Sequence, residues 1–304
     1  MKMPNTPSAP SVSVMMTVKN GARFIEAALE SVYAQSVLPA EIVVVDDGST
    51  DETPEILRRY AGRTPEVRVL APGGVGRSAA LNLAWRSARS ELIANLDADD
   101  IFLPGKLEAQ LAEFARNPEL DLLATASRYI DAEPESAGTP DVADLAASPP
   151  APPHPALPGE QPLCDLARLL PRYNPVNHSS VMMRRSLLEA LDGYNTARRR
   201  QLDYDLWIRA AAAGAVQRII DLPYTGKRIH SAQSFEVRDH LRYVLSSLQL
   251  QLGAIRALHA DSNPSAVARR ARLYLLAFVR VAYRLLPLSL RRRLASAKEQ
   301  ALRR

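Results

Sequence analysis

Two clusters of carboxylates follow short apolar runs in the first third of the chain. One run, EIVVVD, ends in Asp46 and Asp47, and the other, LIANLD, leads into Asp97 and Asp99. A carboxylate at the end of a buried parallel strand can accept a hydrogen bond from a ribose hydroxyl or a base N–H. Side chains two residues apart on an extended chain point the same way, so Asp97 and Asp99 can converge on one cation, and carboxylate oxygens suit Mg²⁺ or Mn²⁺. The alternative explanation is a helix cap with its turn for the first cluster and a solvated acidic loop for the second.

Three further segments carry polar groups beside expected helix or strand ends. Glycines at positions 73, 74 and 76 precede a helix, where backbone N–H groups can cradle an anion, although an ordinary turn explains them nearly as well. Asp203 follows three arginines at the start of another helix, where capping is the ordinary role, but in a cleft it can take a proton from a substrate hydroxyl. Lone histidines such as His178 and His230 more often have a structural role, and a role for His230 as a ligand is expected only beside a bound metal.

Alternating strands and helices must position these groups. Expected strands are Val12–Val18, Glu41–Asp46, Val67–Leu70, Leu92–Leu96 and Leu120–Tyr129, and expected helices are Ala22–Gln35, Asp51–Ala61, Arg77–Arg89 and Pro104–Arg116. Strands that alternate with helices of this length predict βαβ units. The sequence therefore predicts an α/β, Rossmann-like fold with a mostly parallel central sheet flanked by helices.

The chain changes character at Asp131. Eleven of its 23 prolines fall between Asp131 and Pro175, which excludes regular sheet or a long helix there and indicates a functional lid or an insertion. Beyond this loop the pattern of apolar residues predicts strands at Ser179–Met183, Val216–Leu222 and Thr225–Ile229, and helices at Ser186–Leu191, from the DYDLW segment onward, and at Val237–His259, Ala266–Leu286 and Leu290–Leu302.

Charge is unevenly distributed along the chain. The net charge of +5 divides into +10 for residues 264–304, with eleven bases and one acid, and −5 for the remainder, with 27 bases and 32 acids. A basic tail on an acidic body indicates nucleic acid or an anionic membrane surface as a partner. The tail lacks helix-turn-helix and zinc signatures, and its arginines lie between apolar runs, so we expect a membrane surface and no nucleic acid. A helical appendage that packs on the body with a basic outer face is the alternative.

Length and composition limit the remaining possibilities. A chain of 304 residues with 47% hydrophobic residues can form one large α/β domain with an appendage. The sequence has no apolar run of the roughly 18 to 20 residues that span a bilayer, and its N-terminal decapeptide lacks an apolar signal core. A single cysteine, Cys164, excludes an intrachain disulfide. We therefore expect a cytoplasmic protein, peripheral on the inner face of the cytoplasmic membrane.

Six segments of the sequence together resemble the family 2 glycosyltransferases, which are inverting enzymes of the GT-A nucleotide-diphosphosugar-binding fold. The matching segments are SVSVMMTVKNGARFIEAALESVYAQS, EIVVVDDGSTDET, GRSAALN, ELIANLDADDIFLPGKL, NHSSVMMRRSLLEALDGY and DYDLWIR. They extend from about Ser11 to Ser234 and occur in the family's order, which makes the resemblance specific.

This resemblance implies a nucleotide-diphosphosugar donor, usually with UDP, and a saccharide or lipid-linked saccharide acceptor in cell-surface polysaccharide or lipopolysaccharide synthesis. It implies that Asp47 contacts the base, that Asp97 contacts the ribose or the metal, and that Asp99 ligates Mg²⁺ or Mn²⁺ at the diphosphate. Asp203 would be the base that deprotonates the acceptor hydroxyl. The implied residues are Thr17, Lys19, Asn20, Asp46, Asp47, Gly76, Arg77, Asn82, Asp97 and Ala98 on the donor side, Asn177, His178 and Trp207 on the acceptor side, and Asp97, Asp99 and His230 at the metal.

The resemblance also implies a domain organisation. Residues 11–234 would form the glycosyltransferase domain, and residues 1–10 a flexible N-terminus. Within the domain, a donor half at 11–131 and an acceptor half at 176–234 would be joined by the Pro-rich loop 132–175, and residues 235–304 would form a basic helical region.

Three positions depart from the family's usual pattern. Lys19 stands where an aromatic residue often packs against the base, which leaves the donor base open. Leu81 stands where an arginine is usual, and Arg77 lies one turn earlier on the same helix face as a substitute. Leu202 replaces the usual acid before Asp203.

Two other functions remain as alternatives to an active glycosyltransferase. The first is a degenerate nucleotide-sugar-binding protein that scaffolds polysaccharide assembly. The second is a nucleotidyltransferase, which would need a basic glycine-rich loop after the first strand, where the segment Thr17–Gly21 holds one glycine.

Overall fold

The computed structural model describes residues 10–60, 62–130, 163–228, 230, 240–259 and 264–286. Three expectations lie outside these residues: the flexible N-terminus, most of the Pro-rich loop, and the helix predicted at Leu290–Leu302.

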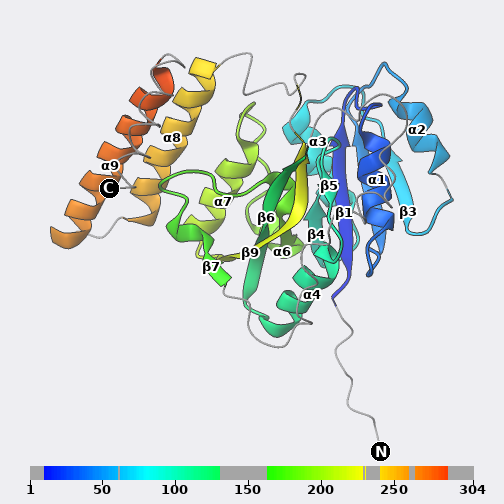
Figure 1. The fold of residues 1–304 in the computed structure, drawn as a ribbon, viewed down its shortest axis with the longest axis horizontal. Coiled ribbons are helices and arrows are strands. Elements are labelled where there is room, and N and C mark those ends of the chain that lie inside the picture. Colours follow the sequence, from blue (N-terminus) through cyan, green and yellow to red (C-terminus); the bar gives the residue numbers. More distant parts are fainter. Residues whose placement is uncertain are drawn as a thin grey trace, which may run out of the picture.

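The described strands form one mixed sheet of nine strands, which crosses the molecule in Figure 1. Parallel pairs join β1 to β2, β2 to β3, β1 to β4, and β6 to β9. The short strand β8 runs antiparallel between β4 and β6, and β5 and β7 pair antiparallel with β9. In sheet order the strands are β3 (Glu66–Leu70), β2 (Glu41–Asp46), β1 (Val12–Val18), β4 (Leu92–Asn95), β8 (Met182–Arg184), β6 (Leu120–Ile130), β9 (Val216–Arg228) and β5 (Ile101–Phe102), with β7 (Leu163–Asp165) beside β9.

Helices cover both faces of this sheet, and the last helix along the chain packs on the helix before it. The described helices are α1 (Ile25–Tyr33), α2 (Thr53–Arg59), α3 (Arg77–Ser87), α4 (Lys106–Arg116), α6 (Arg185–Ala190), α7 (Leu202–Ala212), α8 (His240–Leu258) and α9 (Pro264–Leu285), with short 3₁₀ turns at Leu166–Arg168 and His178–Ser180. None of the helices that the structure describes is long and apolar enough to cross a bilayer.

Alternating residues of the central strands enter two separate hydrophobic cores. Ile42 and Val44 of β2 pack among residues of α1, α2 and α4, whereas Val43 and Val45 pack among residues of α3, α6, α7 and α8. Successive side chains of a strand point to opposite faces, so a strand covered on both faces must be apolar at every position. The α/β fold with helices on both faces of the sheet is therefore confirmed.

Several elements differ from those predicted. The strand β7 lies inside the Pro-rich segment, where regular sheet was not expected, because no proline interrupts the chain between Pro162 and Pro171. Residues expected as a strand at Ser179–Met183 form a 3₁₀ turn at His178–Ser180 followed by β8. The two strands expected on either side of Pro223 are one strand, because register shifts against β6 accommodate the proline. Helix α4 begins after Gly105, so Pro104 precedes the helix instead of lying in its first turn.

Candidate active site

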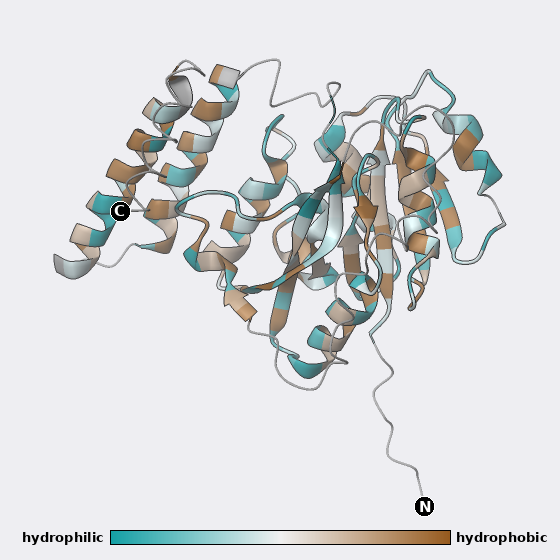
Figure 2. Ribbon diagram, viewed as in Figure 1, coloured by the Kyte–Doolittle hydropathy of each residue, from teal (hydrophilic) through white to brown (hydrophobic). Residues whose placement is uncertain are grey.

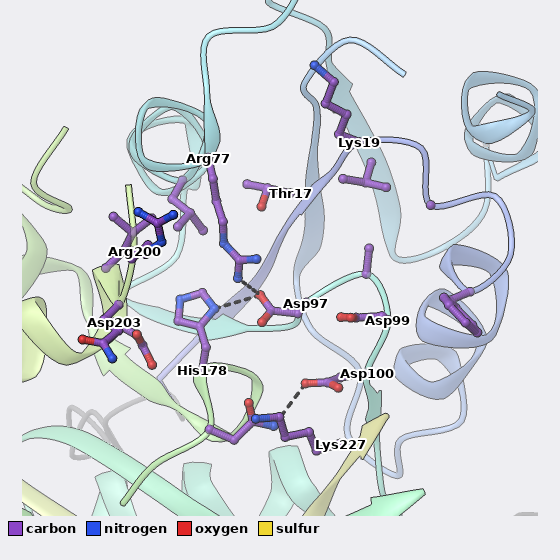
Figure 3. Close-up of a pocket in the computed structure, with 18 of the residues that line it drawn as sticks. Thr17, Lys19, Arg77, Asp97, Asp99, Asp100, His178, Arg200, Asp203 and Lys227 are labelled. Atoms are coloured by element: carbon purple, nitrogen blue, oxygen red, sulfur yellow. Dashed lines mark hydrogen bonds and ion pairs between the residues drawn. The ribbon is translucent and has the colours of Figure 1, made fainter. Parts of the chain in front are cut away.

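A cleft of about 740 Å³ opens where β1 and β4 end and where α7 begins. Its wall includes residues from 11–131, among them Thr17, Lys19 and Arg77, and residues from 176–234, among them His178 and Asp203. Figure 3 shows that these side chains surround a single space. Open α/β sheets bind ligands at the carboxyl ends of their strands, and this cleft has that position.

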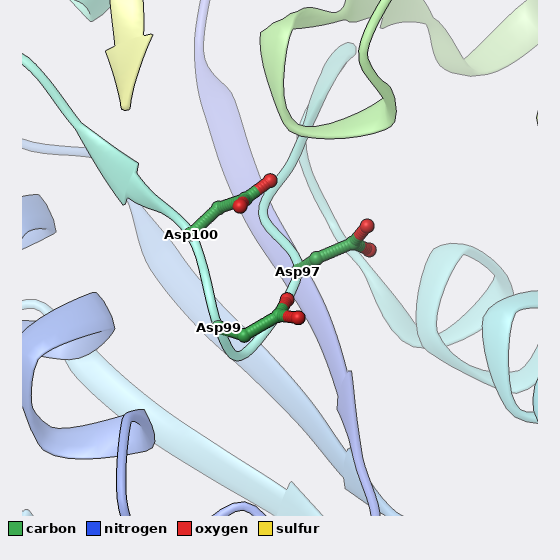
Figure 4. A group of neighbouring side chains, drawn as sticks. All are labelled: Asp97, Asp99 and Asp100. Carbon is green, nitrogen blue, oxygen red and sulfur yellow. The ribbon is translucent and has the colours of Figure 1, made fainter. Parts of the chain in front are cut away.

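Three aspartates converge in a turn directly after β4. Carboxylate oxygens of Asp97, Asp99 and Asp100 lie within 4.8 Å of one another (Figure 4). The backbone from Asp97 to Asp99 was expected to be extended, but it forms a turn, in which the backbone N–H of Asp100 donates to the carbonyl of Asp97 at 3.0 Å. This turn brings the third carboxylate, which the sequence analysis did not select, to the same point.

Asp100 is fixed by hydrogen bonds from outside its own turn. The Ser179 hydroxyl and the Asn177 amide donate to Oδ2 at 2.5 and 3.1 Å, and the backbone N–H of Arg228 donates to Oδ1 at 3.0 Å. Burial, together with the charges of Asp97 and Asp99, raises the pKa of Asp100 to about 7. Like charges are thus held close together in a cleft, which is the arrangement that a bound cation would relieve.

Asp97 lies at the centre of a hydrogen-bond network that joins residues of 11–131 to residues of 176–234. Its Oδ1 accepts from Arg77 at 2.7 Å and lies 2.9 Å from Nδ1 of His178, whose Nε2 is 2.8 Å from the hydroxyl of buried Tyr194. Burial alone would raise the pKa of Asp97, but the charges and hydrogen bonds of Arg77 and His178 hold it well below its ordinary value. Asp97 is therefore held in its ionised form by its two neighbours.

His230 approaches the cluster from the end of β9. Its Nε2 lies 3.0 Å from Oδ2 of Asp99, and its ring packs against Phe24 with centroids 4.7 Å apart. Among the residues that the structure describes, its buried Nδ1 has no hydrogen-bond partner. A set of carboxylate oxygens with one nearby imidazole is a donor set that Mg²⁺ or Mn²⁺ accepts. The residues present therefore fit the divalent metal that the resemblance implies.

Asp203 lies in the first turn of α7, on the wall of the cleft across from the aspartate cluster (Figure 3). Its Oδ2 accepts from the amide of Asn174 at 2.8 Å. Its charge is close enough to contribute, after that of Asp97, to raising the pKa of Arg77. The start of α7 thus places the Asp203 carboxylate on the same cleft as the aspartate cluster.

The glycine-rich segment and the two donor-side loops are tied together by side chains. Asp47 accepts from the backbone N–H groups of Val75 at 2.6 Å and Gly76 at 3.0 Å, and Asp46 accepts from that of Ser49 at 2.9 Å. Asn20, in a left-handed conformation with φ 54°, accepts from the N–H of Thr50 at 2.7 Å. Asp47 therefore uses its oxygens to shape the loop and, with Asp46 and Gly76, is not among the residues that line the described cleft.

The structure places the remaining expected residues in two groups. Thr17, Lys19, Asn20, Ala98 and Asn177 line the cleft, and in Figure 3 the amine of Lys19 points away from the aspartates.

Two other expected residues lie in the interior. The side chain of Asn82 pairs with the backbone N–H and carbonyl of Tyr194 at 2.8 Å each, and Trp207 is fully buried, with its ring centroid 6.4 Å from that of His178. Neither residue lines the cleft; they pack against Tyr194 and His178, which lie next to it.

Sequence reasoning missed several residues of the site. Asn174 contacts Asp203 and lies outside the matching segments, whereas Tyr194 contacts His178 and ends the segment NHSSVMMRRSLLEALDGY, in which it was not selected as a site residue. The wall also includes Arg199 and Arg200, which the sequence shows only as a basic run before Asp203.

Comparison with known proteins identifies the family. The family model for glycosyl transferase family 2 matches residues 13–191, more than half of the chain. The chain belongs to glycosyl transferase family 2. It is 30% identical over 206 residues to EpsE of Bacillus subtilis, which is named a putative glycosyltransferase, and the match covers 66% of this chain and 67% of EpsE. It is 33% identical over 227 residues to the succinoglycan biosynthesis protein ExoU of Rhizobium meliloti, covering 71% of this chain and 61% of ExoU.

Solved structures share the fold. The structure of residues 1–349 of TarS from S. aureus in complex with UDP-GlcNAc has a TM-score of 0.61 and 19% identity, covering 87% of this chain and 70% of that one. The mannosyltransferase PcManGT of Pyrobaculum calidifontis in complex with GDP-Man and Mn²⁺ has a TM-score of 0.58 and 21% identity, covering 97% and 81%. The GT-A-type fold and the family resemblance are thereby confirmed.

Proposed function

We propose that this family 2 glycosyltransferase is an inverting enzyme that moves a sugar from a nucleotide-diphosphosugar to an acceptor hydroxyl. The observation that carries the proposal is the cleft itself, in which a cluster of three aspartates faces Asp203 across one space. An inverting transfer requires an ionised base on one side of the sugar and stabilisation of the departing diphosphate on the other. The two walls of the cleft offer these two parts.

The donor is assigned to the side of the aspartate cluster. Asp97, Asp99 and His230 would hold Mg²⁺ or Mn²⁺, which would stabilise charge on the departing nucleoside diphosphate. Arg77, held against Asp97, adds a permanent positive charge to this wall. UDP is our first choice of nucleotide, and the TarS complex with UDP-GlcNAc supports it, while the PcManGT complex with GDP-Man supports a guanine alternative.

The base is assigned to Asp203. Because Asn174 donates to Oδ2, the rotation of the carboxylate is fixed, and Oδ1 is the atom that would accept the proton of the acceptor hydroxyl. Asp203 lies in the first turn of α7, at the positive end of the helix dipole. Attack at the anomeric carbon would then invert its configuration and release the nucleoside diphosphate.

The acceptor that we propose is a saccharide or a lipid-linked saccharide, used at the cytoplasmic side in the synthesis of a cell-surface polysaccharide. The similarity to ExoU, named for succinoglycan biosynthesis, supports this class. Asn177 and His178 line the cleft, and in Figure 3 His178 lies between Asp203 and Asp97, where such an acceptor would approach.

The experiment is a turnover and binding assay with UDP-, dTDP- and GDP-sugars in the presence of Mn²⁺. Asp203→Asn keeps the shape of the side chain but removes the base, so turnover should fall at least about 10²-fold while donor affinity stays within about twofold. Asp221→Asn, at an exposed aspartate of β9, is the matched control and should behave like the wild type.

Two results would count against the proposal. Unchanged turnover by Asp203→Asn would remove this residue as the base. Donor binding without turnover, for wild type and every acceptor tried, would favour the degenerate scaffold protein instead.

A further inference from the structure

Helix α9 exposes an apolar face that the described part of the chain does not cover. Leu275, Phe278, Val279 and Val267 are 64%, 54%, 53% and 47% exposed. Monomeric proteins seldom leave large apolar side chains gathered on one helix face unless the face meets a partner.

The periodicity of α9 shows that this exposure is systematic. Ala266, Leu273 and Ala277 are buried where α9 packs along α8. The exposed apolar residues are spaced so that they share the opposite side of the helix, at Val267, Ala268, Ala271, Leu275, Phe278, Val279 and Ala282. Figure 2 shows brown residues along this outermost helix, with teal ones between them. One side of α9 thus packs against α8, whereas the opposite side is apolar and exposed in the part of the chain that the structure describes.

Charge indicates what the uncovered face meets. The sequences of α8 and α9 hold seven arginines and no aspartate or glutamate. Arg269 and Arg272 are exposed and lie beside the apolar side of α9, whereas Arg280 is turned to the body, where it donates to the carbonyl of Arg172 and lies over the ring of Tyr173. Arginines bordering an apolar stripe can place their side chains among phosphate headgroups while the apolar residues enter the acyl boundary.

We propose that the outward side of α9 is a docking surface for an anionic lipid bilayer, on which the helix lies flat without crossing it. The apolar side chains named above would enter the interface, and Arg269 and Arg272 would contact the lipid phosphates. A second copy of the chain would have to place a similarly basic helix against this one, and like charges disfavour that pairing.

The position of α8 relates this surface to the cleft. Tyr243 of α8 lines the cleft, and Ser247 of α8 accepts a hydrogen bond from Gln201, two residues before Asp203. Since α9 packs on α8, a docked protein would hold its acceptor side close to the bilayer, where a lipid-linked acceptor would lie. This last step alone rests on the proposed function; the docking surface does not.

The test is co-sedimentation of the full chain with vesicles of phosphatidylcholine alone or with roughly 30% phosphatidylglycerol. We expect binding to the anionic vesicles and at least about fivefold weaker binding to the neutral ones. Leu275→Glu with Phe278→Glu should weaken binding at least about tenfold, because two anchoring side chains are lost. Val37→Glu with Leu38→Glu is the matched control, since both residues are exposed on the loop between α1 and β2, and it should bind within twofold of the wild type.

A second pair of variants tests the charges separately. Arg269→Gln and Arg272→Gln should each weaken binding to anionic vesicles about fivefold and leave binding to neutral vesicles unchanged. All these positions are exposed, so circular dichroism should show native folding throughout.

Three results would overturn the proposal. One is equal binding by the wild type and the Leu275/Phe278 variant. Another is a dimer in light scattering that the same variant dissociates, since a second copy would then cover the face. The third is vesicle binding that appears only when residues 287–304 are deleted, which would show that the chain's own end covers α9. Nucleotide binding in solution is measured independently, so these outcomes leave the proposed activity standing.

Discussion

Removing one buried hydroxyl tests whether the hydrogen bonds that link Asp97 to His178 and His178 to Tyr194 position the aspartate cluster. Tyr194→Phe deletes the group 2.8 Å from Nε2 of His178 and leaves that buried nitrogen without its partner. Loss of a buried hydrogen bond with one partner left unsatisfied costs about 1–3 kcal/mol of stability. The imidazole ring would then no longer be held against Asp97, and loss of such a supporting contact costs about 10- to 100-fold in activity or metal affinity.

Tyr204→Phe provides the matched control. Tyr204 is equally buried, and its hydroxyl donates to the carbonyl of Leu170, which has no part in the hydrogen bonds that reach Asp97. Both variants should therefore lose similar stability in urea unfolding, about 1–3 kcal/mol, but only Tyr194→Phe should lose catalytic efficiency toward the donor sugar. The assay is steady-state kinetics with KM and kcat determined separately. Equal catalytic efficiency in the two variants would refute a positioning role for the hydrogen bonds between Asp97, His178 and Tyr194.

Three further outcomes are expected. Gly193→Ala should destabilise the fold by about 2–4 kcal/mol in urea unfolding, because Gly193 has φ 66° and an added Cβ would overlap Asn82 and Trp85; a loss below about 0.5 kcal/mol would contradict this. Burial lowers the pKa of Lys106 to about 7, so between pH 7 and 10 the unfolded chain binds a proton that the folded chain lacks. The stability of the wild type should therefore rise with pH by up to ~1.4 kcal/mol per unit in this range. The stability advantage of Lys106→Met over the wild type should shrink from pH 7 to 9, and a constant difference in stability would argue against the lowered pKa. Mn²⁺ should raise the unfolding temperature of the wild type but not that of Asp99→Asn, and equal shifts would remove Asp99 as a ligand.

Local patterns were sufficient to predict most of the strands and helices of residues 11–131. The run Glu41–Asp46 is apolar at nearly every position because β2 is covered on both faces, and its predicted bounds match the structure. The strand β5, with two residues, is too short to show a pattern, and its antiparallel pairing with β9 depends on residues more than a hundred positions away. Such pairings are set by tertiary packing and leave little trace in a local stretch of sequence.

The site shows the same division between local and distant information. Asp97 and Asp99 were found because they follow an apolar run, and the structure brings them together with His178, His230 and Asp203 around one cleft. The inclusion of Asp100 depends on a turn and on Ser179, which is 79 residues away in the chain. The contact of Asp47 with the glycine-rich loop likewise joins residues 28 positions apart, a separation at which no local pattern specifies partners.

The central claim is that the aspartate cluster is a metal-dependent site for a nucleoside diphosphate. Calorimetric titration of UDP, dTDP and GDP into the full chain, with Mn²⁺ and then with a chelator, measures this directly. We expect one nucleotide to bind with Mn²⁺, at least about tenfold weaker binding once the metal is removed, and a similar loss in Asp99→Asn. Equal affinity with and without metal, or no binding of any of the three nucleotides, would contradict the claim.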